Sequence, residues 1–360
     1  MIDASADDRP VEIDGSDGEG GGQVVRSSLA LSAVTGRPLR LTNIRAGRSK
    51  PGLLRQHLTG LRAMTAVTDA DVDGGHLGST TLTFTPRAPR GGRYAFEVGS
   101  AGSTVLVAQT ILPALLAADG PSTVTIGGGT HAAFAPPFDF FAEVYLPMVR
   151  RMGGRATCEL TRFGFYPAGG GGVVIDVRPS VLDRSLHLSE RGGEAGVRVT
   201  ALVAGVPISV ARRECDVVAR RGGWPTIESR PNVAEPSGGP GNTLMVTLAY
   251  EHVTEMFTAH GRKGVRGEQV ARDVVRAAKR YEGTDVPVGP HLADQLLLPM
   301  ALAAMNGADG SFRTADPTGH FRTHVDVIHR FLPVQISTRR EDGAAVRVDV
   351  RKSGSGSGMT

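Results

Sequence analysis

The chain has 360 residues, of which 40% are hydrophobic and 21% are charged, with a formal net charge of +4. No apolar run approaches membrane-spanning length, which excludes a membrane protein and predicts a soluble globular chain of two or more domains. Cys158 and Cys215 fit neither a disulfide framework nor a zinc motif, and the first residues lack the apolar core of a signal peptide, so we expect a cytoplasmic protein.

The first informative segment, residues 13–35, joins a glycine-rich loop to a helix. Glycines let the backbone approach a ligand closely, and the helix start adds free N–H groups with Arg26 in its first turn. The pattern therefore predicts an anion site. Glu19 stands among the glycines, where a carboxylate would repel a phosphate unless a divalent cation lay between them. We interpret it as a contact for Mg²⁺ or Mn²⁺; the alternative is a solvated turn residue.

Three segments of the chain share one order of elements. Each predicts a helix that opens on glutamine and ends near a glycine, a short strand, a turn with a basic residue or histidine, and a second helix. The opening glutamines are Gln23, Gln109 and Gln295. Alternating strands close the segments: TLTFTP, VVIDVRP and VRVDVRK. The pattern predicts an α+β fold built from three βαβαββ repeats.

The spacing of these repeats predicts an inserted domain. Gln23 and Gln109 are 86 residues apart, whereas Gln109 and Gln295 are 186 apart, so about 100 residues are inserted between repeats two and three. We expect a large domain of three repeats over residues 1–186 and 287–352. A smaller α/β domain should occupy residues 187–286, and a flexible tail residues 353–360.

The inserted domain carries a basic helix and the chain's one tryptophan. The helix predicted over residues 267–281 has apolar residues on one face and arginines elsewhere, which indicates a solvated face or an RNA contact. Trp224 follows two glycines, and we expect it to pack rather than to stack on a base.

Groups that bind anions recur in the turns of all three repeats. If the repeats meet around one cleft, these groups converge on an anionic ligand. The residues concerned are Arg26, Arg45, Arg48, Arg55, Thr130, His131, Pro136, His291, Gln295 and His320. Pro136 and His291 could cover the two faces of a nucleobase, or they could simply begin helices.

His320 lies where a short strand ends in Asp-Pro-Thr-Gly and a helix begins. Loops at such junctions often carry chemistry, and the helix start offers an anion site beside the imidazole. The alternative is a hydrogen-bonded loop histidine. Lysine is scarce, and neither a Walker A motif nor Lys-x-Asp-Gly is present, so histidine is the expected acceptor if a covalent nucleotide forms.

Seven motifs in order carry a resemblance to a known family. They are GEGGGQ (18–23), IRAGRSKPGLLRQHL (44–58), GSAGST (99–104), GGTHAAFAPPFDF (128–140), FGFYPAGGGG (163–172), HLADQLLLPMALA (291–303) and the segment around His320. Together they resemble the RNA 3'-terminal phosphate cyclase family over residues 11–351. The resemblance implies ATP-dependent conversion of an RNA 3'-phosphate to a 2',3'-cyclic phosphodiester, through a histidine-AMP and an RNA-adenylate anhydride. It also implies three repeats like the C-terminal domain of translation initiation factor three, with a smaller inserted domain.

The resemblance also implies roles for residues of this chain. His320 matches the adenylated nucleophile, and Glu19 matches the acid near the metal and the ATP phosphates. Phosphate-binding positions match Arg26, Arg48 and Gln56. ATP-binding positions match Gln109, Pro136, His291, Leu292, Ala293, Asp294 and Gln295, with Pro136 and His291 flanking the adenine. The implied partners are ATP and RNA with a 3'-terminal phosphate.

Two departures from the family pattern and two other classes of protein bear on this interpretation. Residue 291 is tyrosine in some members of the family and histidine here, which weakens stacking on a base, and His131-Ala132 stands where members have Asp-Asn or His-Asn.

A non-catalytic relative that binds RNA or assists ribosome assembly would share the fold, but we expect it to lack His320. An enolpyruvyl transferase also has βαβαββ repeats, but it prefers a lysine-rich site.

Overall fold

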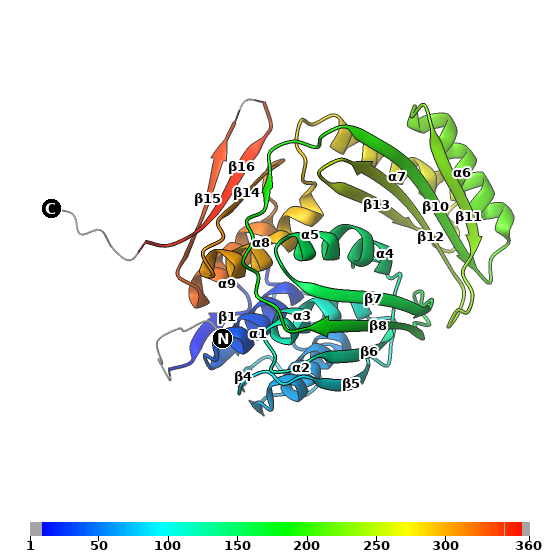
Figure 1. The fold of residues 1–360 in the computed structure, drawn as a ribbon. Coiled ribbons are helices and arrows are strands. Elements are labelled where there is room, and N and C mark those ends of the chain that lie inside the picture. The colour runs from blue at the N-terminus through cyan, green and yellow to red at the C-terminus, as the bar shows by residue number, and fades with distance from the viewer. Residues whose placement is uncertain (1–8, 342, 355–360) are drawn as a thin grey trace.

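The strands of the protein form four separate sheets of four strands each, within the part of the chain that the computed structural model describes, residues 9–341 and 343–354. Helices cover these sheets, so the α+β class expected from the sequence is confirmed (Figure 1). Most of the tail expected over residues 353–360 lies outside the described residues. Within the described ranges, no helix combines the length and apolar character needed to cross a bilayer.

The first sheet has the strand order β1-β2-β4-β3. Its members are β1 (Val11–Asp14), β2 (Leu39–Thr42), β3 (Asp71–Asp73) and β4 (Leu82–Thr85). β1 and β2 are parallel, and the other two pairings are antiparallel. The connecting helices are α1 (Gly22–Thr35) and α2 (Arg55–Thr68). α1 ends at Gly36, which takes the left-handed conformation that glycine adopts without strain.

The second sheet repeats this pairing with the order β5-β6-β8-β7. Its members are β5 (Gly92–Glu97), β6 (Ser122–Gly128), β7 (Arg155–Arg162) and β8 (Gly171–Arg178). β5 and β6 are parallel, and β8 is antiparallel to both β6 and β7. Its helices are α3 (Thr104–Leu116) and a bent series of α4 (Phe138–Phe140), the π-helix η1 (Phe141–Tyr145) and α5 (Leu146–Arg151).

The third sheet again has one parallel and two antiparallel pairings. Its order is β9-β14-β16-β15, with β9 (His187–Leu188), β14 (Gly310–Thr314), β15 (Val334–Arg340) and β16 (Val346–Lys352). Its helices are α8 (Pro290–Met305) and α9 (Gly319–Phe331). β9 lies within residues 187–286, yet it pairs with β14 of this third sheet.

The fourth sheet has the order β11-β10-β12-β13, and its parallel pair is β10 and β11. Its members are β10 (Glu194–Ala204), β11 (Ile227–Val233), β12 (Gly241–Tyr250) and β13 (Thr254–His260). The helices α6 (Ile208–Gly222) and α7 (Gly267–Glu282) cover one face and close a second hydrophobic core (Figure 1). Trp224 is buried there, as expected, and donates a hydrogen bond from Nε1 to Glu282.

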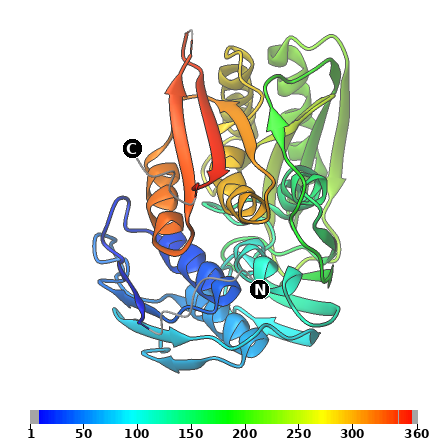
Figure 2. The same cartoon turned by 60° about the vertical axis from the view of Figure 1, so that its left-hand side comes forward.

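The helices of the first three sheets pack against one another in the interior. α1 contacts α2, α3 and α9, while α8 contacts α9, so segments far apart in sequence lie side by side (Figures 1 and 2).

Two of the predicted helix starts are wrong. α3 and α8 begin five residues before Gln109 and Gln295, because Ser103 caps α3 and Pro290 suits the first turn of α8.

Candidate active site

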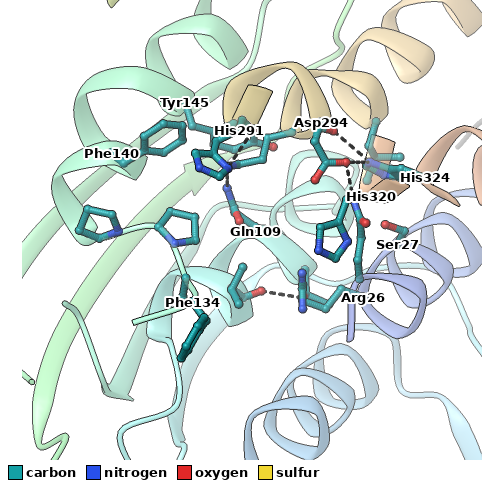
Figure 3. Close-up of a pocket in the computed structure, with 18 of the residues that line it drawn as sticks. Arg26, Ser27, Gln109, Phe134, Phe140, Tyr145, His291, Asp294, His320 and His324 are labelled. Atoms are coloured by element: carbon teal, nitrogen blue, oxygen red, sulfur yellow. Dashed lines mark hydrogen bonds and ion pairs between the residues drawn. The ribbon is translucent and has the colours of Figure 1, made fainter. Parts of the chain in front are cut away.

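A cavity of about 500 Å³ opens where α1, α3, α8 and α9 approach one another and β13. One end is apolar and carries Phe134, Phe140 and Tyr145, while the other is polar and carries Arg26, Asp294 and His320 (Figure 3). A pocket with an aromatic end and a charged end suits a ligand with a flat apolar part and an anionic part. ATP has both parts.

The glycine loop before α1 brings Glu19 to His320. Gly18 and Gly20 have φ values of 60° and 53°, which glycine adopts without strain, and the loop curls back onto α9. Thr323 of α9 holds the loop, since its Oγ1 accepts a hydrogen bond from the Glu19 backbone N–H at 3.1 Å. His320 Nε2 then lies 3.0 Å from Glu19 Oε2. The predicted acid and the predicted nucleophile, 301 positions apart in sequence, are therefore in direct contact.

His320 is the second residue of α9, at the end of the helix that faces the cavity. Thr318 caps this helix, and its side chain accepts a hydrogen bond from the Phe321 N–H at 3.1 Å. The His320 side chain is 48% exposed, so it is open to a ligand. The partner of its ring is Glu19 of the glycine loop, not a group of its own turn.

Arg48 reaches the same loop from the connection between β2 and α2. Its Nη2 donates to the Glu19 backbone carbonyl at 2.9 Å and lies 3.8 Å from Glu19 Oε2. Arg48 and Thr323 therefore both hold Glu19 in place, and Arg48 adds a positive charge beside His320. Both ionic groups are partly exposed, so a ligand can reach them from solvent.

Arg26 lies at the polar end of the cavity without a carboxylate partner. No acid of the described residues lies within ion-pairing distance of its guanidinium, and Asp294 acts on it only through space. Burial lowers the pKa of Arg26 to about 10, so the group stays charged at neutral pH. A desolvated guanidinium without a carboxylate partner is a strong site for phosphate.

Asp294 links α1, α8 and α9 beneath the cavity. Its Oδ1 accepts from Gln23 Nε2 at 2.5 Å and lies 3.2 Å from His324 Nδ1. Burial acts to raise the pKa of Asp294, but hydrogen bonding to His324 and Gln23 outweighs burial and holds this pKa below its usual value. The carboxylate is therefore ionised and fixed, and it can accept hydrogen bonds from ligand hydroxyls.

Two glutamines from different repeats meet across the cavity. Gln109 Nε2 donates to Gln295 Oε1, and Gln295 Nε2 donates to the His291 carbonyl at 3.2 Å. His291 and Pro136 both line the cavity near this pair. Desolvation by the groups around the ring lowers the pKa of His291, which favours its neutral form.

Some of the predicted residues do not line the cavity. Leu292 and Ala293 are buried in the main core, because the inward face of α8 packs against its neighbours. Gln56 Oε1 instead accepts from the Ser103 N–H at 2.8 Å and ties α2 to the start of α3. Arg45 donates to the carbonyls of Lys50 and Gly52 and so shapes its own loop.

His131 was expected to face the cleft, and the structure places it elsewhere. Its side chain is buried against Phe163 and Phe165, whose ring centroids each lie 5.5 Å away. Its Nε2 lies 2.8 Å from Asp139, and its Nδ1 lies 2.9 Å from Thr130 Oγ1. Thr130 and His131 therefore stabilise the loop that leads to Pro136 and do not line the cavity.

One wall of the cavity comes from the fourth sheet, and sequence reasoning did not predict this. Met256, Thr258 and His260 of β13 line it. These residues are two positions apart along one strand, so the sequence could predict that their side chains share a face. The alternation does not predict which part of the protein this face of the strand contacts.

Glu255, next to these residues, supports the start of α8. It is fully buried, and its Oε1 accepts from the Gly289 N–H, the cap of α8, at 2.6 Å. Burial raises the pKa of Glu255 to about 8, although this hydrogen bond acts in the opposite direction. The folded protein therefore holds a proton that the unfolded chain releases near its ordinary pKa.

We expect the melting temperature of the parent protein to fall relative to that of Glu255→Gln between about pH 5 and pH 8. In this range the unfolded state binds fewer protons at Glu255, so rising pH favours unfolding by up to about 1.4 kcal/mol per unit. Gln keeps an acceptor for Gly289 N–H but does not titrate. Thermal melts across this range test the prediction, with the exposed Glu159→Gln as control. Parallel pH profiles for the parent and Glu255→Gln would refute it.

Comparison with known proteins gives long and consistent matches. A family model described as RNA 3'-terminal phosphate cyclase matches residues 17–338. Three curated proteins with the name RNA 3'-terminal phosphate cyclase are similar over most of this chain. The protein of Ralstonia nicotianae is 48% identical over 94% of this chain and 97% of its own length. That of Ectopseudomonas mendocina is 46% identical over 95% and 98%, and that of Salmonella enteritidis is 47% identical over 94% and 99%.

Among solved structures, the enolpyruvyl transferase NikO from Streptomyces tendae matches 47% of this chain and 33% of its own. The identity is 18% and the TM-score is 0.28. A similarity at this level carries no argument for the fold or the activity of this chain.

Proposed function

The chain belongs to the RNA 3'-terminal phosphate cyclase family, and from this premise we propose that it uses ATP to convert an RNA 3'-phosphate to a 2',3'-cyclic phosphodiester through AMP bound to His320. The observation that carries the proposal is the pairing of the half-exposed His320 with Glu19, beside a cavity that also holds Arg26. A ring nitrogen, an acid and a guanidinium free of any carboxylate are the groups that nucleotide transfer to histidine needs.

ATP would bind with its adenine toward the apolar end of the cavity. Pro136 and His291 would lie against the two faces of the base, and the neutral imidazole favours this contact. Asp294, Gln109 and Gln295 offer oxygen and N–H groups to the ribose. Arg26 and Arg48 would then face the phosphates, at the end where His320 lies.

In the first step, His320 Nε2 would attack the α-phosphorus of ATP. An N–P bond forms, the P–O bond to pyrophosphate breaks, and pyrophosphate leaves with the electron pair. Glu19 lies within hydrogen-bond distance of this nitrogen and can take the Nε2 proton of the imidazolium form, so that the ring keeps its proton on Nδ1 and Nε2 has the lone pair for phosphorus. The positive charges of Arg26 and Arg48 offset the charge that develops on the phosphate oxygens.

The next two steps would take place on the RNA. An oxygen of the RNA 3'-phosphate attacks the phosphorus of the histidine-AMP, so a P–O bond forms and the N–P bond breaks. The neighbouring ribose 2'-OH then attacks the 3'-phosphorus, loses its proton to solvent and expels AMP. Because the ribose itself holds that hydroxyl next to the phosphorus, this last step depends mainly on positioning.

A divalent cation, Mg²⁺ or Mn²⁺, fits this site only together with the phosphates. No group of three or more His, Cys, Asp or Glu side chains that could hold an ion occurs in residues 9–341 and 343–354. Mg²⁺ commonly takes one or two carboxylates and fills its shell with substrate phosphates and water. Glu19 would supply the carboxylate oxygen, and the bound ion would neutralise phosphate charge.

The proposal includes a domain organisation of three repeats and one insertion. Numbered along the chain, the four strands of each of the first three sheets lie side by side in the order first, second, fourth, third, which supports three βαβαββ repeats. The different order of the fourth sheet supports its status as an insertion. Because β9 pairs with the third sheet, the inserted domain would begin after Leu188 rather than at residue 187.

The direct test is to incubate the pure protein with ATP labelled at the α-phosphate and Mg²⁺ or Mn²⁺, and then to denature it. We expect label on the protein that is stable to base and labile to acid. RNA with a 3'-phosphate should then release AMP and gain a cyclic end, whereas RNA with a 3'-hydroxyl should not. Absence of label with every metal would refute the covalent mechanism, and binding of RNA without label would favour a non-catalytic RNA-binding factor.

A further inference from the structure

A second histidine, His57, lies beside the glycine loop and has no role in the mechanism above. It is the third residue of α2, it is 7% exposed, and it does not line the cavity. The Leu54 backbone N–H donates a hydrogen bond to its Nδ1 at 3.1 Å. An Nδ1 that accepts must carry a lone pair, so the proton of the neutral ring is on Nε2.

The ring of His57 stays neutral at physiological pH. Burial, together with the positive charges of Arg26 and Arg45, lowers the pKa of His57 to about 3. A neutral ring with its proton on Nε2 is a hydrogen-bond donor there and cannot act as a nucleophile at that atom. His320, by contrast, is half exposed and lines the cavity, and its Nε2 lies beside Glu19, which can take a proton from it.

The Nε2 of His57 points at the start of α1. A Cβ built on Gly22 would lie 2.2 Å from this nitrogen and 3.2 Å from Arg26 Nη1. A Cβ on the preceding Gly21 would lie 3.1 Å from Arg48 Nη2 and 3.6 Å from His320 Cε1. The two glycines therefore lie against His57, Arg26, Arg48 and His320, and a side chain at either position would crowd these groups.

No described residue accepts a hydrogen bond from His57 Nε2. This nitrogen is also not one of the fully enclosed unpaired atoms, so a ligand atom can reach it. A nearly buried N–H donor normally has a partner, because leaving one unpaired costs about 1–3 kcal/mol. The unpaired edge of the ring is therefore available to donate to an oxygen atom of a ligand that enters from solvent.

The start of α1 favours an anion as that ligand. α1 has 14 residues, Gly21 caps it without a side chain, and its first turn contains no acid. The first N–H groups of such a helix are free and carry the positive end of the helix dipole. His57 and Arg26 add a neutral and a charged donor on the same side.

We propose that His57 Nε2–H donates a hydrogen bond to a phosphate group held over Gly21 and Gly22, together with Arg26 and the first N–H groups of α1. This inference deepens the proposed function and rests on it for the identity of the ligand. The phosphate is either part of the pyrophosphate that ATP releases or the 3'-phosphate of the RNA. A neutral donor holds such a group without joining the chemistry at His320.

Two substitutions separate this role from a structural one. In His57→Asn the side-chain oxygen can replace Nδ1 and accept from Leu54 N–H, but the amide is too short to reach Gly22. In His57→Gln the oxygen can accept that N–H, as in a capping box, while the amide N–H extends toward Gly22. Both variants should fold, and their melting temperatures in the absence of ligand should agree with each other.

Stabilisation by inorganic pyrophosphate tests the phosphate site without any chemistry. We expect pyrophosphate to raise the melting temperature of the parent and of His57→Gln at similar concentrations. His57→Asn should need about ten- to a hundredfold more. Equal responses of all three proteins would overturn the proposal. This result is separate from the proposed function, because it requires neither labelling nor cyclisation.

The two reaction stages then identify the phosphate. If the group belongs to ATP, His57→Asn should be labelled about ten- to a hundredfold more slowly at limiting ATP, and His57→Gln should not. If the group belongs to the RNA, labelling should be normal and cyclisation by the labelled enzyme should slow by the same factor. A His57→Asn variant that equals the parent in both stages would also overturn the proposal.

Discussion

His320→Ala is expected to abolish transfer of the α-phosphate label from ATP to the protein, by about a thousandfold or more. The substitution removes the ring nitrogen that lies next to Glu19, on a side chain that lines the cavity. His57 cannot replace it, because its Nδ1 is occupied by Leu54 and its Nε2 carries the proton. Labelling of the denatured variant with α-labelled ATP measures the loss directly.

His329→Ala is the matched control for this prediction. His329 lies on the same helix α9 but in its last turn, where it is exposed. We expect labelling of this variant to match that of the parent, and both alanine variants should retain the parent's fold by circular dichroism. Full labelling of His320→Ala would show that another residue accepts AMP and would overturn the mechanism.

Arg26→Ala is expected to slow labelling by about a hundred- to a thousandfold. Arg26 is charged, desolvated and without a carboxylate partner, so its charge is available to the phosphates throughout the transfer. Removing one such preorganised charge typically costs this much in rate, since water cannot replace it in a partly buried site. The labelling rate at saturating ATP measures the effect on the chemical step, and its dependence on ATP concentration measures the effect on binding.

Two further variants sharpen the Arg26 experiment. Arg62→Ala removes an exposed arginine of α2 and should label at the parent rate, which controls for a general loss of positive charge. Arg26→Lys keeps the charge but loses the planar fork of donors, so we expect part of the rate to return. Labelling of Arg26→Ala at the parent rate would remove this residue from the phosphate site.

Local patterns in the sequence were enough to predict most secondary-structure elements. The predicted strands TLTFTP, VVIDVRP and VRVDVRK contain or overlap β4, β8 and β16, and the basic helix over residues 267–281 is α7. Periodicity and turn residues are properties of neighbouring positions, so they can be recognised from the sequence before the fold is known. The starts of α3 and α8 were wrong because the glutamine pattern marked an interior position, whereas the caps lie earlier.

Placement of side chains in the site was harder to predict. The sequence located Arg26, Asp294 and His320, which line one end of the cavity, and Glu19, which contacts His320. It also proposed His131 for the cleft, whereas the structure buries that ring against two phenylalanines. The sequence around a loop histidine is the same whether its ring is buried in a core or faces a cleft, so only the tertiary contacts distinguish the two cases.

By itself, the sequence determined the family and the α+β class, because motifs and periodicity are properties of short stretches of chain, and it predicted which residues would bind phosphate. Only the tertiary structure decided which of those residues share a cavity, that β13 supplies one wall, and that His57 presents an unpaired N–H to Gly22. These contacts join positions tens to hundreds of residues apart. They depend on how helices and sheets pack, and packing is a property of the whole chain.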